Sequence, residues 1–75
     1  SRWRTLITPD GWKLNVSAGD LGELYDLADD PHEQRNRITD PAQDRRIRHM
    51  LERLRSWQHE TGDTCSLPTE PAAMH

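Results

Sequence analysis

The second half of this chain is rich in arginine, a residue type that binds phosphate and sulfate groups well. Five arginines lie between positions 45 and 55: Arg45, Arg46, Arg48, Arg53 and Arg55. A guanidinium donates paired hydrogen bonds to an oxyanion, so one hypothesis is an anion-binding helix face. The alternative is a solvated face whose arginines pair with Asp44, Glu52 and nearby acids. The net charge of −3 favours this alternative.

The histidines of the chain could also bind a metal, but their spacing does not match a metal site. They are His32, His49, His59 and His75. No pair has the i, i+4 spacing with an acid that zinc-protease helices use. His49 follows Ile47 by two positions and therefore falls off the apolar stripe of its segment. We expect surface or capping histidines.

An acidic cluster lies near the middle of the chain: Asp26, Asp29, Asp30 and Glu33. It lacks the glycine and the ligand spacing of known calcium loops, and helix capping explains Asp30 and Glu33 without an ion. We expect Asp26 to accept a hydrogen bond from Arg2 or Arg4, and Lys13 to be an exposed lysine of a sheet. No catalytic, cofactor-binding or metal-binding residue is predicted.

Alternating side chains and turn residues predict three strands in the first part of the chain, over residues 2–8, 12–16 and 21–27. Pro9-Asp10-Gly11 is a strong turn between the first two. We expect Leu6 on the sheet face opposite the helix, together with either Leu24 or Tyr25. Little else in the chain could cover that face, so it should seek a partner.

Two acid–proline pairs predict helix starts. At the first, Asp30 is the predicted N-cap of a one-turn helix with Pro31 at its first position, and Glu33 closes a capping box. Asn36 suits a left-handed C-terminal cap.

At the second pair, Asp40 is the predicted N-cap of a long helix with Pro41 at its first position and Gln43 at N3. Gly62 is expected to end this helix. Its stripe at i, i+3, i+4 and i+7 spacing comprises Ile47, Met50, Leu51, Leu54, Trp57 and Gln58.

Composition indicates one small domain. The chain has 75 residues, of which 32% are hydrophobic and 31% charged. Its negative net charge argues against a nucleic-acid partner, and no apolar run is long enough for a membrane span. Cys65 is the only cysteine, so no intrachain disulfide is possible, and cysteine usage does not indicate the redox compartment of the protein.

The expected fold class is α+β: a small antiparallel meander of about three to four strands, packed by one long C-terminal amphipathic helix. The domain is expected to span residues 1–63, with residues 64–75 as an extended or disordered tail. Because one sheet face lacks a cover, we expect the isolated chain to self-associate.

The segment Glu23–Asn36, with the sequence ELYDLADDPHEQRN, resembles the E-L-Y-D-L-x-x-D-P-x-E-x-x-N-L signature near the C-terminus of sulfatases. These enzymes belong to the alkaline-phosphatase-like superfamily. The order of the parts is also similar, from about Arg2 to Asp63. Arg37 stands where that family usually has Leu, and we expect Ile38 to take over the buried contact.

The resemblance implies that the chain is the non-catalytic C-terminal subdomain of a sulfuric ester hydrolase, and that its partner is the N-terminal catalytic domain of the parent protein. Calcium and formylglycine are then expected in the parent enzyme. The family's formylglycine arises in a Cys/Ser-x-Pro-x-Arg motif. The segment CSLPTE, starting at Cys65, has Pro one position late and Glu in place of Arg, so it is not that motif.

Two alternatives remain open. The parent could be a related hydrolase of phosphate or phosphonate esters, which the nucleophile motif upstream would distinguish. The chain could instead be a free-standing interaction module whose arginine-rich helix binds an anionic partner.

Overall fold

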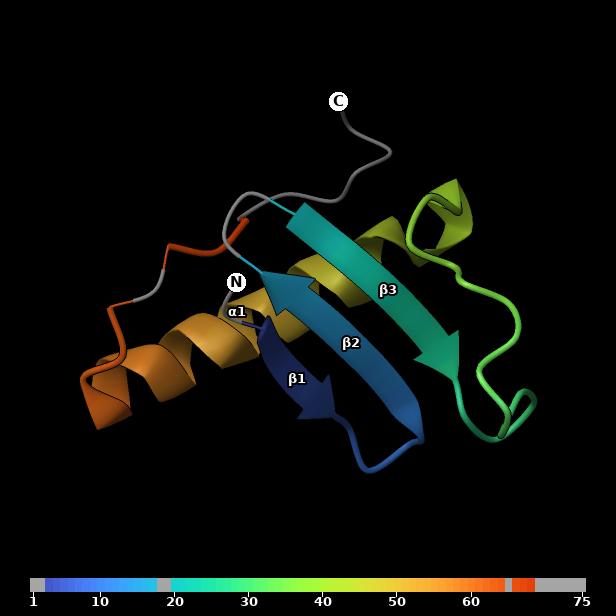
Figure 1. Ribbon diagram of the computed structural model, residues 1–75, viewed down its shortest axis with the longest axis horizontal. Helices are drawn as coiled ribbons and strands as arrows, with labels where there is room; N and C mark the ends of the chain where they lie inside the picture. Colours follow the sequence, from blue (N-terminus) through green and yellow to red (C-terminus); the bar gives the residue numbers. More distant parts are fainter. Residues whose placement is uncertain (1–2, 18–19, 65, 69–75) are drawn as a thin grey trace.

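A computed structural model describes residues 3–17, 20–64 and 66–68, and within them it has the expected α+β fold (Figure 1). Strands β1 (Trp3–Ile7), β2 (Trp12–Ser17) and β3 (Asp20–Asp26) form one antiparallel sheet in the order β1-β2-β3. A 3-10 turn, η1 (Pro41–Gln43), continues into the long helix α1 (Asp44–Thr61). The helix crosses one face of the sheet (Figure 1).

The strand register decides which side chains face the helix. Leu6, Leu14 and Leu24 pair across the three strands. Leu14 and Leu24 are fully buried, and Leu6 packs against the same core. The prediction that Leu6 lies on the uncovered face is therefore wrong. The turn between β1 and β2 pairs Ile7 with Lys13, and this register places Leu6 opposite the inward-facing Leu14.

The opposite, outer face of β1 is open. Side chains alternate along a strand, so Trp3 and Ile7 lie on this face. Their exposed fractions are 48% and 58%. Two large apolar side chains thus remain in solvent on the side of the sheet away from α1.

The helical segment ends at Gly62 as predicted and begins after Asp40, but its first turn is the 3-10 turn η1 and α1 itself begins at Asp44. The Asp40 carboxylate accepts a hydrogen bond from the Ala42 N–H at 3.0 Å. Gly62 adopts the left-handed conformation, with φ of 74°, and its N–H bonds to the Gln58 carbonyl. Gln43 does not close the expected capping box, because its side chain accepts from Arg46 at 3.2 Å.

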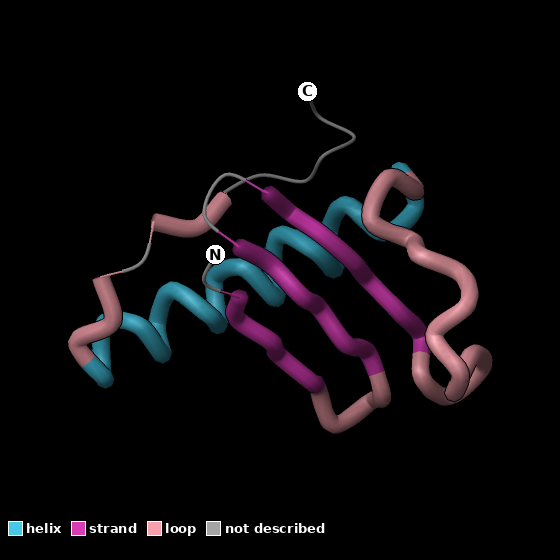
Figure 2. Tube along the Cα trace, viewed as in Figure 1, coloured by secondary structure: helices cyan, strands magenta, loops and turns pink. Residues whose placement is uncertain are grey.

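The buried face of α1 comprises Ile47, Met50, Leu51, Leu54 and Gln58. Trp57, which was predicted to belong to this stripe, is 45% exposed. The C-terminal end of α1 extends past the edge strand β1 (Figure 2), so the sheet does not cover every side chain of the stripe. The apolar period of the helix is right, but the buried face passes from Leu54 to Gln58 and leaves Trp57 out.

The core also receives residues from outside the sheet and α1. Ile38 is buried, as expected from its place just after the segment Glu23–Asn36, which we call the signature segment. Leu67 packs against the core from the segment assigned to the tail, whereas residues 65 and 69–75 lie outside the described residues. In the described parts of the chain, no helix combines the length and apolar character needed to cross a membrane.

Candidate functional site

The signature segment continues from β3 into a loop, not into the predicted one-turn helix. After β3 the chain forms turns between residues 27 and 40 (Figure 2). Asp30 still acts as a cap, since its carboxylate accepts from the Gln34 N–H at 3.0 Å and the Arg35 N–H at 2.9 Å. These bonds hold the pKa of Asp30 below its ordinary value. Glu33 has a φ of 55°, and this left-handed residue prevents a right-handed helix from continuing.

The Glu33 side chain reaches the sheet and does not close a capping box with Asp30. Its carboxylate lies 2.7 Å from the Lys13 ammonium on β2. Tyr25 is paired with Lys13 on the neighbouring strand and is only 8% exposed. Burial raises the pKa of Tyr25, and the negative charges of Glu23 and Glu33 raise it further. The loop therefore covers one part of the outer face.

Asn36 fastens the loop along the free side of β3. Its side-chain oxygen accepts from the Leu24 N–H at 2.9 Å and the Ile38 N–H at 3.0 Å, and its amide donates to the Gly22 carbonyl at 3.1 Å. The Arg37 N–H also bonds to the Leu24 carbonyl at 2.8 Å. Asn36 is not the left-handed cap that was predicted. We call this set of bonds around Asn36 the asparagine clasp.

A bidentate ion pair joins the edge of the sheet to the end of α1. The Arg4 guanidinium donates to both oxygens of Asp63, at 2.6 and 2.8 Å. The expected bond from Arg4 to Asp26 is therefore not formed. Asp26 instead accepts from the Ala28 N–H at 3.2 Å. Arg2, the other expected partner of Asp26, lies outside the described residues.

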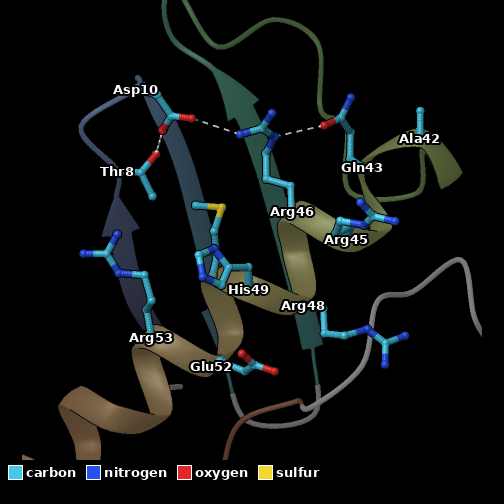
Figure 3. Close-up of a pocket in the computed structure, with 11 residues that line it drawn as sticks. Thr8, Asp10, Ala42, Gln43, Arg45, Arg46, Arg48, His49, Glu52 and Arg53 are labelled. Atoms are coloured by element: carbon cyan, nitrogen blue, oxygen red, sulfur yellow. Dashed lines mark hydrogen bonds and ion pairs between the residues drawn. The ribbon is translucent and has the colours of Figure 1, made fainter.

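A groove of about 710 Å³ opens between the β1–β2 turn and the first half of α1 (Figure 3). We call it the arginine groove. Its charged lining residues are Asp10, Arg45, Arg46, Arg48, Glu52 and Arg53, and His49 lies among them. Four arginines against two carboxylates give it a surplus of two positive charges. The groove thus concentrates positive charge in a chain whose net charge is negative.

Arg46 is held in a fixed position at the top of this groove. It donates to the Asp10 carboxylate at 3.1 Å and to the Gln43 side-chain oxygen at 3.2 Å (Figure 3). Its guanidinium carbon also lies 4.2 Å from the centre of the Trp12 ring, a cation–π contact. A hydrogen bond from the Thr8 hydroxyl is the main cause that lowers the pKa of Asp10, and Arg46 contributes to it. No local pattern predicts this arrangement, because Arg46 is far along the chain from Asp10 and Trp12.

The other arginines of the groove differ in their surroundings. Arg45 and Arg53 are exposed. In the part of the chain that the structure describes, neither has a hydrogen bond or an ion pair from its side chain. Arg48 extends away from the rest (Figure 3). The i, i+4, i+8 spacing of Arg45, His49 and Arg53 was the sequence signal that could have located this row.

The remaining predicted candidates do not converge on a metal site. His32, His49 and His59 are exposed, and His75 lies outside the described residues. Among residues 3–17, 20–64 and 66–68, no group of three or more His, Cys, Asp or Glu side chains could hold a metal ion. The Asp30 carboxylate accepts hydrogen bonds from backbone N–H groups of its own loop, and the Glu33 carboxylate pairs with Lys13. These residues therefore do not fit calcium.

Comparisons with models of protein families, with curated proteins and with solved structures give no significant match for this chain. The similarity to sulfatases therefore stays a prediction that depends on the signature residues.

Proposed function

We propose that this chain is the non-catalytic C-terminal subdomain of a sulfatase-like sulfuric ester hydrolase, and that it completes the fold of the parent enzyme. The observation that carries the proposal is the asparagine clasp. The Asn36 side chain joins β3 to the loop by hydrogen bonds to backbone groups, so this signature residue acts as a structural part. A role in fold completion explains why the segment needs a short amide at position 36 and an acid at position 30.

The open outer face supports the same proposal. Trp3 and Ile7 expose apolar surface beside the free edge of β1. Exposed edges and apolar patches of this kind are usually covered in a native assembly. In our proposal the N-terminal catalytic domain of the parent protein covers them, and that domain holds the calcium and the formylglycine.

Two measurements test this proposal. The first is to determine the coding sequence upstream of Ser1, and the second is to assay the complete protein that it encodes. We expect a Cys/Ser-x-Pro-x-Arg motif upstream, and we expect the complete protein to hydrolyse an aryl sulfate. The 75-residue chain alone should show no turnover. A Thr or an unmodified Ser nucleophile, with turnover of an aryl phosphate, would identify the phosphate- or phosphonate-ester alternative. An upstream region that encodes no hydrolase domain, or turnover by the purified chain itself, would overturn the proposal.

A further inference from the structure

We propose that the arginine groove is a binding site for a ligand that carries at least two sulfate or phosphate ester groups. This inference does not depend on the proposed function, because it concerns binding to the helix face of this chain and requires no parent enzyme. Sulfate and phosphate esters share the tetrahedral anion that guanidinium groups recognise, so the experiment below separates the two sources.

The spacing of the two exposed arginines in this row sets the size of the ligand. Arg45, His49 and Arg53 follow one another at i, i+4 and i+8 and therefore lie in one row along α1. With a rise of about 1.5 Å per residue, the first and last of them are about 12 Å apart along the helix axis. Two ester groups on one molecule match this spacing better than a single tetrahedral anion, which would require both side chains to bend toward one point.

Arg46 supplies a fixed anchor beside the row. Among the described residues, two side chains accept hydrogen bonds from its guanidinium, those of Asp10 and Gln43, and a guanidinium has five N–H donors in total. Because Trp12 and Asp10 already hold this side chain, little further conformational entropy is lost when a ligand binds to it. Asp10 is neutralised by the same contact, so it opposes an anion less than a free carboxylate would.

The surroundings of Arg45 and Arg53 support ligand binding. The alternative is a solvated helix face on which every arginine pairs with an acid. The alternative requires each arginine of the groove to have an acidic partner in the chain itself. Arg46 has one, but Arg45 and Arg53 have no such partner within the described residues. Two unpaired guanidinium groups beside a held third one create a local positive potential, which recruits multivalent anions at low salt.

The test measures binding of two probes, sucrose octasulfate and inositol hexakisphosphate, by titration calorimetry with the complete chain at low and at moderate salt. We expect at least one probe to bind, with an affinity that falls as salt rises. Replacing both Arg45→Gln and Arg53→Gln should weaken binding about tenfold or more, since two charge-assisted contacts to the ligand are lost. Circular dichroism should show an unchanged fold, because both side chains are exposed.

The matched control is Arg55→Gln, which removes one positive charge from the same helix but outside the groove. It should change the affinity less than about twofold, as screening predicts for a distant charge. Preference for one probe would identify the ester as sulfate or phosphate and would support the site. The proposal is overturned if neither probe binds at low salt, if Arg55→Gln weakens binding as much as the double variant, or if inorganic sulfate or phosphate binds as tightly as the probes.

Discussion

Asn36 illustrates how one short side chain connects segments that are distant in the sequence. Its amide bonds to the backbone of Gly22, Leu24 and Ile38. From the sequence, Asn36 was expected to act locally, as the left-handed cap of a one-turn helix. Gly22 and Leu24 lie on β3, and they are within reach because the loop returns along the edge of that strand.

Replacing Asn36→Ala should lower the free energy of unfolding by about 1–3 kcal/mol. The substitution leaves the Leu24 and Ile38 N–H groups and the Gly22 carbonyl without their side-chain partner. Urea unfolding followed by circular dichroism measures the effect. Gln34→Ala is the control, because Gln34 is exposed in the same loop, and it should change stability by less than about 0.5 kcal/mol. Equal effects of the two variants would contradict the role of the clasp.

The strands and the long helix follow from local patterns in the sequence. Alternation predicts β1 to β3, and the acid–proline start and Gly62 end predict the helix. The face of β1 was harder to predict, because shifting the register by one residue would turn Leu6 to the other side of the sheet. The loop was also predicted wrongly, since capping residues serve a tight turn as well as they serve a helix.

Two glycines with similar backbone conformations should differ in their tolerance of a side chain. Gly22 and Gly62 have φ of 70° and 74°. At Gly62 an added Cβ meets nothing within 4 Å, so Gly62→Ala should cost about 1–2 kcal/mol from the backbone alone. At Gly22 the Cβ would lie 2.5 Å from the Asn15 carbonyl oxygen and 2.6 Å from the Trp3 ring.

Gly22→Ala should therefore destabilise the chain by about 1–3 kcal/mol more than Gly62→Ala, the range typical of overpacking. Gly22 lies in a bulge, where two residues of β3 face Val16 of β2. The Trp3 ring packs over it from β1. Thermal unfolding of the two variants side by side measures the difference. If Gly22→Ala were the milder of the two, the close packing of Trp3 on the bulge would be refuted.

At the scale of the whole molecule, the sheet has a helix on one face and side chains in solvent on part of the other. Trp3 and Ile7 are the large apolar residues of this open part. A chain of 75 residues buries too little surface to leave such side chains exposed without cost. We therefore expect the isolated chain to associate with copies of itself when the proposed parent domain is absent.

Sedimentation velocity over a series of concentrations tests this expectation. The average mass should rise with concentration for the chain as it stands, and Ile7→Lys should shift it toward the monomer by placing a charge on the open face. Thr39→Lys is the matched control, since it adds the same charge at an exposed loop position and should leave the association unchanged. A monomer at the highest soluble concentration would contradict the expectation.

For this protein, the sequence by itself determined the element types, the ends of the long helix and the α+β class, because periodicity and capping act between residues that are close in the chain. Ile38 was also placed correctly in the core. Only the tertiary structure decided that Leu6 faces inward, that Trp57 is exposed, that Arg4 pairs with Asp63, and that Asp10, Trp12 and Arg46 meet at one groove. Each of these depends on strand register or on the crossing of helix and sheet, which join residues too distant for any local pattern to record.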